Sequence, residues 1–173
     1  MLSRLNIYII DTNYVHYLEQ FDRNVCDPKT LDGGSRPYVG IFLFETTDFY
    51  YFAPLTSQTN KPDFYCVKLY GPNKKAIASV RINNMIPIPK RMVNLFSVYE
   101  YQSLINSTNP KQRKYGYLLK YEVISMNHND VKSKLEQKAK VFYRDYKVDK
   151  SLGKICNDFK LLEEKALEFK KTS

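Results

Sequence analysis

Short apolar runs, several with polar residues at alternate positions, fill most of the first half of the chain and are typical of β-strands. Turn-forming segments separate them: Thr46-Thr47-Asp48, Gly71-Pro72-Asn73 and the polar loop 27–36 with its Gly33-Gly34 pair. The last run is expected to break at Asn83-Asn84 and to end at two prolines. The pattern predicts strands over residues 5–10, 38–45, 49–54, 64–70 and 76–89.

Apolar residues recur at helical spacing in one early segment, 14–21, and again through the last third of the chain. Thr12 or Asn13 is expected to cap the early helix. Three later helices are predicted: over 111–126, from a cap at Asn129 or Asp130 to about 148, and from a cap at Ser151 over 152–170.

Strands first and helices later indicate an α+β fold, which we expect to form one domain over residues 1–173. The expected architecture is a compact, strongly curved antiparallel sheet or partly open barrel, with flanking helices and a mostly helical C-terminal half. Alternating strand–helix–strand units are absent from the pattern, so a nucleotide-binding parallel sheet is not predicted.

The composition is basic and rich in aromatic residues. Lys and Arg number 27 against 18 Asp and Glu, a formal net charge of +9, beside 15 Tyr and 10 Phe. Such a charge favours polyanionic partners, and rings among basic residues suit unpaired RNA bases, which stack on them. Most of the tyrosines must still be strand or core residues. A membrane surface is disfavoured because the basic helices also carry many glutamates.

The cysteines and the N-terminus indicate a cytoplasmic protein. Cys26, Cys66 and Cys156 have no metal-like spacing, and we expect reduced thiols. No window approaches ~20 apolar residues, and the segment Met1 to Leu5 lacks a signal-peptide layout.

Motifs of several enzyme classes do not occur in the chain. GxxxxGK[ST], GxGxxG and GxSxG are missing, so neither a nucleotide cofactor nor a serine hydrolase is indicated. The two histidines, His16 and His128, fall on separate predicted helices, and no Cys, His or carboxylate cluster has metal-ligand spacing. We therefore expect no metal and no other cofactor. A His–His ribonuclease pair remains open if the fold brings the two together.

One loop, residues 51–61, stands apart because an apolar strand gives way there to a polar segment that ends in a lysine. Thr56 and Ser57 offer hydroxyl and backbone N–H groups, and Lys61 offers a positive charge. Together these groups suit a scissile phosphate. The alternative is a plain β-loop rich in turn-forming residues.

Four motifs, in order, resemble the ToxN/AbiQ family of type III toxin–antitoxin endoribonucleases. They are Tyr14-Val15-His16-Tyr17-Leu18, Ser35-Arg36-Pro37-Tyr38-Val39-Gly40-Ile41, Tyr51 to Ser57 (a YxAPLTS core) and Asn84-Met85-Ile86-Pro87-Ile88. The resemblance spans most of the chain. It implies a MazF- and CcdB-like barrel with added helices. It also implies metal-independent cleavage of RNA by the adjacent 2′-OH, which leaves a 2′,3′-cyclic phosphate.

The resemblance further implies that the inhibitor is RNA. In the family this antitoxin is a pseudoknot that the toxin cuts from a tandem-repeat transcript, and protein and RNA assemble into hetero-oligomers. Growth arrest or abortive phage infection would follow. Residue by residue, Thr56 and Ser57 match the active-site hydroxyl pair, and Arg36 matches a basic groove residue. Tyr14 and Tyr38 match aromatic positions of the RNA-binding groove.

The catalytic lysine is the point where this chain departs from the pattern. The family lysine lies two residues after the serine, where this chain has Thr59, and Lys61 follows two residues later. Arg36 and Lys61, with loop N–H groups, are the candidates for stabilising the phosphorane charge, and Ser57 for orienting ribose or phosphate. Arg does not act as a base. Lys61, or in-line positioning alone, would have to serve instead.

Six basic residues are expected to contact phosphates along a groove: Arg81, Lys90, Arg91, Lys111, Arg113 and Lys114. Two other functions stay open. A non-catalytic RNA-binding protein explains the charge and the tyrosines but not the 51–61 loop. A toxin or scaffold that binds a protein target is compatible with a CcdB-like fold.

Overall fold

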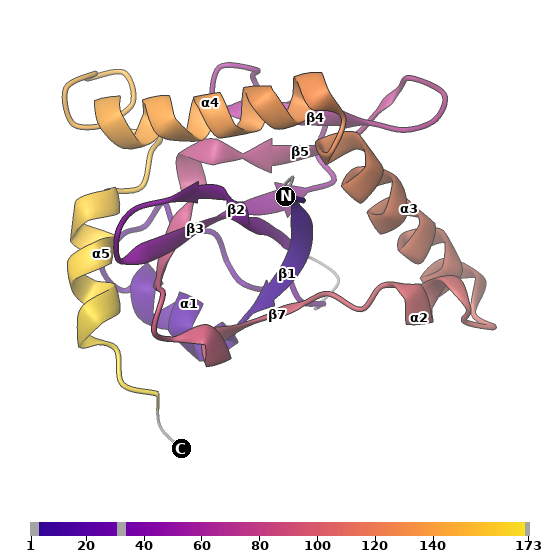
Figure 1. Ribbon diagram of the computed structural model, residues 1–173, viewed down its shortest axis with the longest axis horizontal. Coiled ribbons are helices and arrows are strands. Elements are labelled where there is room, and N and C mark those ends of the chain that lie inside the picture. The colour runs from indigo at the N-terminus through magenta and orange to yellow at the C-terminus, as the bar shows by residue number, and fades with distance from the viewer. Residues whose placement is uncertain (1–3, 31–33, 172–173) are drawn as a thin grey trace.

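The computed structural model describes residues 4–30 and 34–171, and shows one curved antiparallel sheet surrounded by helices (Figure 1). The strands follow the order β4-β5-β3-β2-β1-β7, and β6 also pairs with β3. Within the described residues the two ends of this order, β4 and β7, do not pair, so the barrel stays open. The predicted α+β class and partly open sheet are confirmed. The strands are β1 (Asn6–Ile10), β2 (Tyr38–Glu45), β3 (Phe49–Thr56), β4 (Cys66–Tyr70), β5 (Ala76–Arg81), β6 (Ile86–Pro89) and β7 (Phe96–Val98).

The sheet bends around β3. One edge of β3 pairs with β2, whereas the other pairs with β6 over Phe49–Phe52 and with β5 over Leu55–Thr56. Between β5 and β6 the chain forms a single 3₁₀ turn, η1 (Ile82–Asn84), which lets both strands use that edge. The expected break at Asn83-Asn84 therefore exists, and it divides the predicted 76–89 run into two strands.

The core is packed tightly around β3. Tyr51, Phe52 and Ala53 have no exposed surface, in keeping with a strand that is covered on both faces. Gly40 of β2 lies directly against the Phe52 ring, so that a Cβ built at Gly40 would stand 2.0 Å from Cδ1 of that ring. The glycine of the 35–41 motif is thus explained by close packing.

The helices enclose the sheet from several sides (Figure 1). In this view α4 runs along β4 and β5, α3 lies at one end of the molecule, and α5 stands with α1 at the other. None of the described helices is long and apolar enough to cross a membrane. The helical elements are α1 (Thr12–Glu19), η2 (Val93–Leu95), α2 (Gln102–Ile105), α3 (Pro110–Met126), α4 (Asn129–Asp145) and α5 (Phe159–Glu168).

One carboxylate joins two of these helices to the sheet. Oε1 of Glu163 on α5 accepts from the Tyr51 hydroxyl of β3 at 2.7 Å and from the Tyr143 hydroxyl of α4 at 2.8 Å. The pKa of Tyr51 is raised well above its ordinary value, first by burial and then by the nearby Glu163. Tyr51 therefore stays neutral and donates its proton to the carboxylate.

The last helix is shorter than predicted. Segment 152–158 is irregular, and α5 begins only after Asp158, whose carboxylate accepts the Leu161 N–H at 3.1 Å. Asn157 supplies the reason. Its N–H donates to the Asn83 carbonyl and its side chain donates to the Met85 carbonyl. A helix through Asn157 would use that N–H internally and break the contact with η1.

Smaller differences concern helix caps and short elements. The cap of α1 is Asp11 instead of Thr12 or Asn13, and α4 begins after His128. The sequence pattern does not predict β7 or α2, because elements of three or four residues are too short to show a periodicity. Met1–Ser3 and Leu31–Gly33, which include part of the predicted 27–36 loop, lie outside the described residues.

Candidate nucleic-acid interface and cleavage site

The end of β3 carries the two hydroxyl residues singled out in the sequence. Thr56 ends the strand and pairs with Ser79 of β5. The chain turns there because Oγ1 of Thr56 accepts the Gln58 N–H at 3.2 Å, while the Ser79 hydroxyl donates to the Gln58 carbonyl at 2.9 Å. Ser57 is left exposed, and its hydroxyl has no partner in the described part of the chain.

Arg36, just before β2, reaches the same strand end. Its guanidinium donates to the carbonyls of Asp27 at 2.6 Å, Lys29 at 3.3 Å and Leu55 at 3.4 Å. These bonds tie the loop around residues 27–29 to β3 and fix the cation beside the residue that precedes Thr56. Because arginine has five N–H donors, others remain for a substrate.

Cys26, a half-buried thiol, shows which charges lie close together. Burial raises the pKa of this thiol, the positive charges of Arg81 and Arg36 lower it, Glu19 raises it, and Lys61 lowers it. Three cations from distant parts of the sequence thus act on one thiol. Since burial outweighs them, Cys26 stays protonated near neutral pH and is not a thiolate nucleophile.

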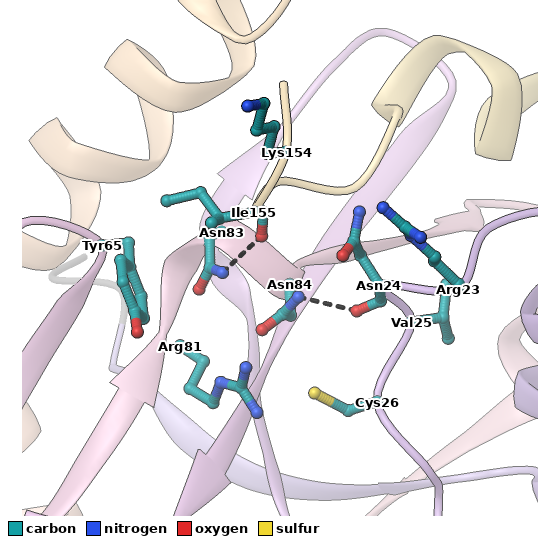
Figure 2. A pocket seen from close by; sticks show the side chains of 10 residues that line it. All are labelled: Arg23, Asn24, Val25, Cys26, Tyr65, Arg81, Asn83, Asn84, Lys154 and Ile155. Carbon is teal, nitrogen blue, oxygen red and sulfur yellow. Dashed lines mark hydrogen bonds between the residues drawn. The ribbon is translucent and has the colours of Figure 1, made fainter. Parts of the chain in front are cut away.

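A cleft of about 320 Å³ opens next to Cys26 (Figure 2). Its walls come from four separate stretches of sequence: 23–26, Tyr65, Arg81 with Asn83-Asn84, and 154–155. Arg23, Arg81 and Lys154 line it, and the described lining includes no acidic side chain. The charge therefore favours an anionic ligand.

Asparagine side chains hold the walls of this cleft together. The Nδ2 group of Asn83 donates to the Ile155 carbonyl at 2.6 Å, and that of Asn84 donates to the Asn24 carbonyl at 2.7 Å (Figure 2). Nδ2 of Asn24 in turn donates to the Cys156 carbonyl at 3.2 Å. Each bond joins a side chain to a backbone group, so η1 is fixed between two loops that are remote in sequence.

A family model for the toxin ToxN of type III toxin–antitoxin systems matches residues 6–167. This chain belongs to that family. An endoribonuclease ToxN of Bacillus thuringiensis subsp. kurstaki is 31% identical over 172 residues, which cover 94% of this chain and 83% of the relative.

Solved structures agree with the assignment to the ToxN family. One, from a study of selective toxin inhibition by a non-coding RNA pseudoknot in type III systems, is 28% identical with a TM-score of 0.83, and the match covers 98% of this chain and all of that chain. A second solved structure is AbiQ, a lactococcal anti-phage endoribonuclease of a type III toxin–antitoxin system. The match has a TM-score of 0.76 at 24% identity and covers 96% of this chain and 98% of AbiQ. This similarity shows that the two proteins share a fold.

The two tyrosines that the ToxN/AbiQ resemblance placed in an RNA groove lie in the core. Tyr14 is 0% and Tyr38 is 1% exposed. The Tyr14 hydroxyl donates to the Pro87 carbonyl, and its ring packs edge-on against Phe169. A ring without exposed surface cannot stack on a base, so we assign both tyrosines to the core and not to RNA contact.

The six basic residues predicted to contact phosphates occupy three separate places. Arg81 lines the cleft. Lys90 and Arg91 follow β6, where the Lys90 ammonium pairs with Glu45 and lies 5.2 Å from the centre of the Tyr50 ring. The other three, Lys111, Arg113 and Lys114, are exposed in the first turns of α3.

The exposed surface of α3 is positively charged. Its one acidic residue, Glu122, is buried, and burial raises the pKa of this carboxyl to about 8, so it is largely protonated at neutral pH. A groove of about 570 Å³ runs along the helix between Lys111, Lys114 and aromatic residues such as Tyr117. Lysines beside exposed rings suit single-stranded RNA.

The two histidines stay apart. His16 on α1 has its Nδ1 2.6 Å from Oε2 of Glu19, whereas His128 caps α4 and is exposed. In Figure 1, α1 and the start of α4 are on different sides of the molecule. No group of three His, Cys, Asp or Glu residues within the described ranges is arranged to hold a metal.

Several residues that line the cleft are not predicted from the sequence. Arg23, Asn24, Tyr65 and Lys154 belong to segments without a motif, and only the folded chain brings them together. The adjacent Asn83-Asn84 pair did carry a signal, since two amides interrupt an apolar run there. From the sequence alone this pair indicates a break in a strand, and Asn84 also begins the fourth of the motifs that resemble the ToxN/AbiQ family.

Proposed function

We propose that the chain is a single-domain, metal-independent endoribonuclease toxin that cuts single-stranded RNA by attack of the adjacent 2′-OH and leaves a 2′,3′-cyclic phosphate. The observation that carries the proposal is the arrangement at the end of β3. There Arg36 is fixed on the Leu55 carbonyl, two residues before the exposed Ser57, inside a region that matches the ToxN family throughout. The relatives named as endoribonucleases support the reaction class.

Each group has a role that fits its surroundings. Ser57 is exposed and uncommitted, so its hydroxyl is available to hold a ribose or phosphate oxygen. The Thr56 hydroxyl is occupied by the Gln58 N–H, so Thr56 shapes the turn and presents its neighbour. Arg36, fixed by three carbonyls, and Lys61, which has no ion pair among the described residues, supply positive charge for the phosphorane.

In-line positioning supplies the rest of the rate. When the protein holds the 2′-OH, the phosphorus and the 5′-oxygen in line, the orientational entropy is lost on binding. The reaction step then has a lower barrier than it has in free RNA. The thiol of Cys26 remains protonated and Arg36 remains charged, so neither takes the 2′-OH proton. In this scheme solvent water takes the 2′-OH proton, and the ammonium of Lys61 gives a proton to the leaving 5′-oxygen.

We extend the proposal to the partner of the enzyme. The related structure inhibited by a non-coding RNA pseudoknot supports an antitoxin of the same kind, cut from a repeat transcript by the toxin itself and held in a protein–RNA hetero-oligomer. Toxin released from it would arrest growth or abort phage infection in the cytoplasm. Arg81, Lys90 and Arg91 are proposed to contact its phosphates, as are Lys111, Arg113 and Lys114.

The decisive experiment measures cleavage of a short single-stranded RNA by purified protein. Ser57→Ala and Lys61→Ala are each expected to lower the rate about 10²–10³-fold, the usual cost of removing one transition-state donor. Both variants should also lose growth inhibition while keeping the circular dichroism spectrum and unfolding midpoint of the parent. Matched controls are Ser97→Ala on β7 and Lys140→Ala on α4, both exposed and on elements that do not pair with β3, which should cut at the parental rate.

The chemistry has its own controls. Cleavage should persist in EDTA, and a single 2′-deoxy substitution at the nucleotide 5′ of the cut should abolish it. A product end that resists ligation until the cyclic phosphate is removed identifies the 2′-OH route. Cleavage of the 2′-deoxy substrate, or its loss in EDTA, would contradict the mechanism. Tight RNA binding without any cut would instead favour a non-catalytic RNA-binding protein.

A further inference from the structure

Two buried amide oxygens in the cleft have no hydrogen-bond donor. Asn83 and Asn84 are 2% and 3% exposed, and their Oδ1 atoms are without a partner in the described part of the chain. Because both Nδ2 groups are held by backbone carbonyls, the amides cannot turn over without breaking those bonds. Figure 2 shows both oxygens directed toward the side of the cleft where Arg81 and Tyr65 lie.

Such acceptors call for an explanation. A buried carbonyl oxygen without a donor costs free energy, and most proteins leave few of them. Here two stand side by side in one turn, and Nε of the neighbouring Arg81 is also buried without a partner. The cleft therefore offers two adjacent acceptors and one cationic donor, a pattern that a ligand with two adjacent N–H groups and one acceptor would complete.

The surroundings narrow the class of ligand. Arg23, Arg81 and Lys154 would repel a cation, so the donor must be a neutral group carried by an anion. A nucleobase with an exocyclic amino group meets these requirements, since it is neutral, donates two N–H bonds and hangs from a phosphate backbone. Uracil does not, because its single N–H leaves one Asn oxygen facing a carbonyl.

The cleft also lies close to the proposed cleavage site. Arg81, which lines the cleft, is two residues after Ser79 on β5, and Ser79 pairs with Thr56 at the end of β3. A nucleotide near a phosphate at the end of β3 would thus bring its base within reach of Asn83 and Asn84.

We propose that this cleft is a base-selective subsite for substrate RNA, in which Asn83 and Asn84 accept from the exocyclic amino group of an adenine, cytosine or guanine and Arg81 donates to a ring nitrogen or carbonyl. This inference rests on the endoribonuclease function proposed above. The two asparagines act as specificity-determining residues and take no part in bond breaking.

The first test changes the RNA and leaves the protein intact. In a cleaved RNA, each amino-bearing nucleotide within two positions of the cut is replaced singly by its des-amino analogue: purine riboside for adenosine, pyrimidin-2-one riboside for cytidine and inosine for guanosine. At one position kcat/KM should fall about 10- to 100-fold, as expected when buried polar groups are left unpaired. Values within about twofold at every position would overturn the proposal.

The second test shows whether the amino group meets Asn84. In Asn84→Ala the ratio of kcat/KM between the parent RNA and its des-amino analogue should fall severalfold towards one, because only the Asn83 acceptor remains for the amino group. The matched control is Asn157→Ala. Asn157 is also buried, also donates to a backbone carbonyl and also has an unpartnered Oδ1, but does not line the cleft. It should keep the parental ratio, whatever stability it loses.

The outcomes separate the two proposals. If the parent protein cuts no RNA, the endoribonuclease function fails and the subsite falls with it. If the parent cuts RNA without regard to amino groups, the subsite alone is refuted. A ratio that persists in Asn84→Ala also refutes it, because a purely structural asparagine would slow both substrates equally. Should Asn84→Ala not fold, the des-amino series on the parent protein decides the question.

Discussion

Replacing Gly40 by alanine drives a methyl group into the ring of Phe52. The new Cβ would stand 2.0 Å from Cδ1 and 2.4 Å from Cε1 of that ring. Normal contact requires at least about 3.4 Å, so the ring must retreat by more than about 1 Å. Phe52 is fully buried, with the rings of Tyr8 and Phe96 centred 5.4 and 5.0 Å away, and has no open space to enter.

The two opposing effects of the substitution differ in size. Overpacking of a core costs about 1–3 kcal/mol. The loss of backbone freedom in the unfolded chain returns about 0.4–1 kcal/mol. We therefore expect Gly40→Ala to lower the free energy of unfolding by roughly 1–2 kcal/mol, and to lower Tm by about 2–8 °C for a chain of this size.

Urea unfolding followed by circular dichroism measures this loss. All proteins should carry Ser57→Ala, so that expression of an active toxin does not limit the yield. The matched control is Gly153→Ala, whose Cβ would lie 3.9 Å from the nearest heavy atom, the Lys150 carbonyl oxygen. It should stay within about 0.5 kcal/mol of the parent. Equal midpoints for the two alanine variants would refute the close packing of β2 against β3.

Three further outcomes are expected. Ser79→Ala should lower stability by about 0.5–1.5 kcal/mol and should slow cleavage less than Ser57→Ala, with kcat more affected than KM, because it frees the Gln58 carbonyl and loosens the turn. The Glu122 carboxyl keeps its proton in the folded state up to about pH 8 but loses it near pH 4.5 when the chain is unfolded, so the free energy of unfolding should fall as pH rises between these values. Urea midpoints at about pH 5 and pH 8 measure this fall, and Glu122→Gln should remove it. Lys111→Gln with Lys114→Gln should weaken RNA binding and reduce the slope of log K against log salt by about two, while a slope equal to that of the parent would place the RNA elsewhere.

Local patterns predicted most of the strands, because burial of β3 and its neighbours gives continuous or alternating apolar runs. The bounds of β2 agree with the prediction, Tyr38–Glu45. The last helix shows where such reasoning fails. Residues 152–158 have a helical apolar pattern, yet Asn157 is held by η1, more than 70 residues away in sequence. The periodicity of apolar residues along the sequence does not reveal such a tertiary contact.

The candidate site likewise contains residues that the sequence motifs single out and residues that they do not. Thr56, Ser57 and Arg36 could be singled out because they belong to contiguous motifs at strand ends, and their role in cleavage stays a prediction. The exposure of an aromatic side chain depends on which layers cover it, and the motifs that placed Tyr14 and Tyr38 in an RNA-binding groove do not contain that information. Arg81 and the motif that begins at Asn84 could be singled out, but the cleft itself could not, because its other three stretches have no motif and only the folded chain brings them together.

The bond between Asn24 and the Cys156 carbonyl spans 132 residues of sequence, and it bears on how the protein is made. A nascent chain on the ribosome has its β3 hydroxyls and Lys61 long before residues 154–157 exist to complete the cleft. Chains grow at about 5–20 residues per second, so roughly 5–20 s separate the two events. During that interval the polypeptide lies beside messenger and ribosomal RNA with the cleft still incomplete. The order of synthesis thus delays completion of the cleft until nearly the whole chain has been made.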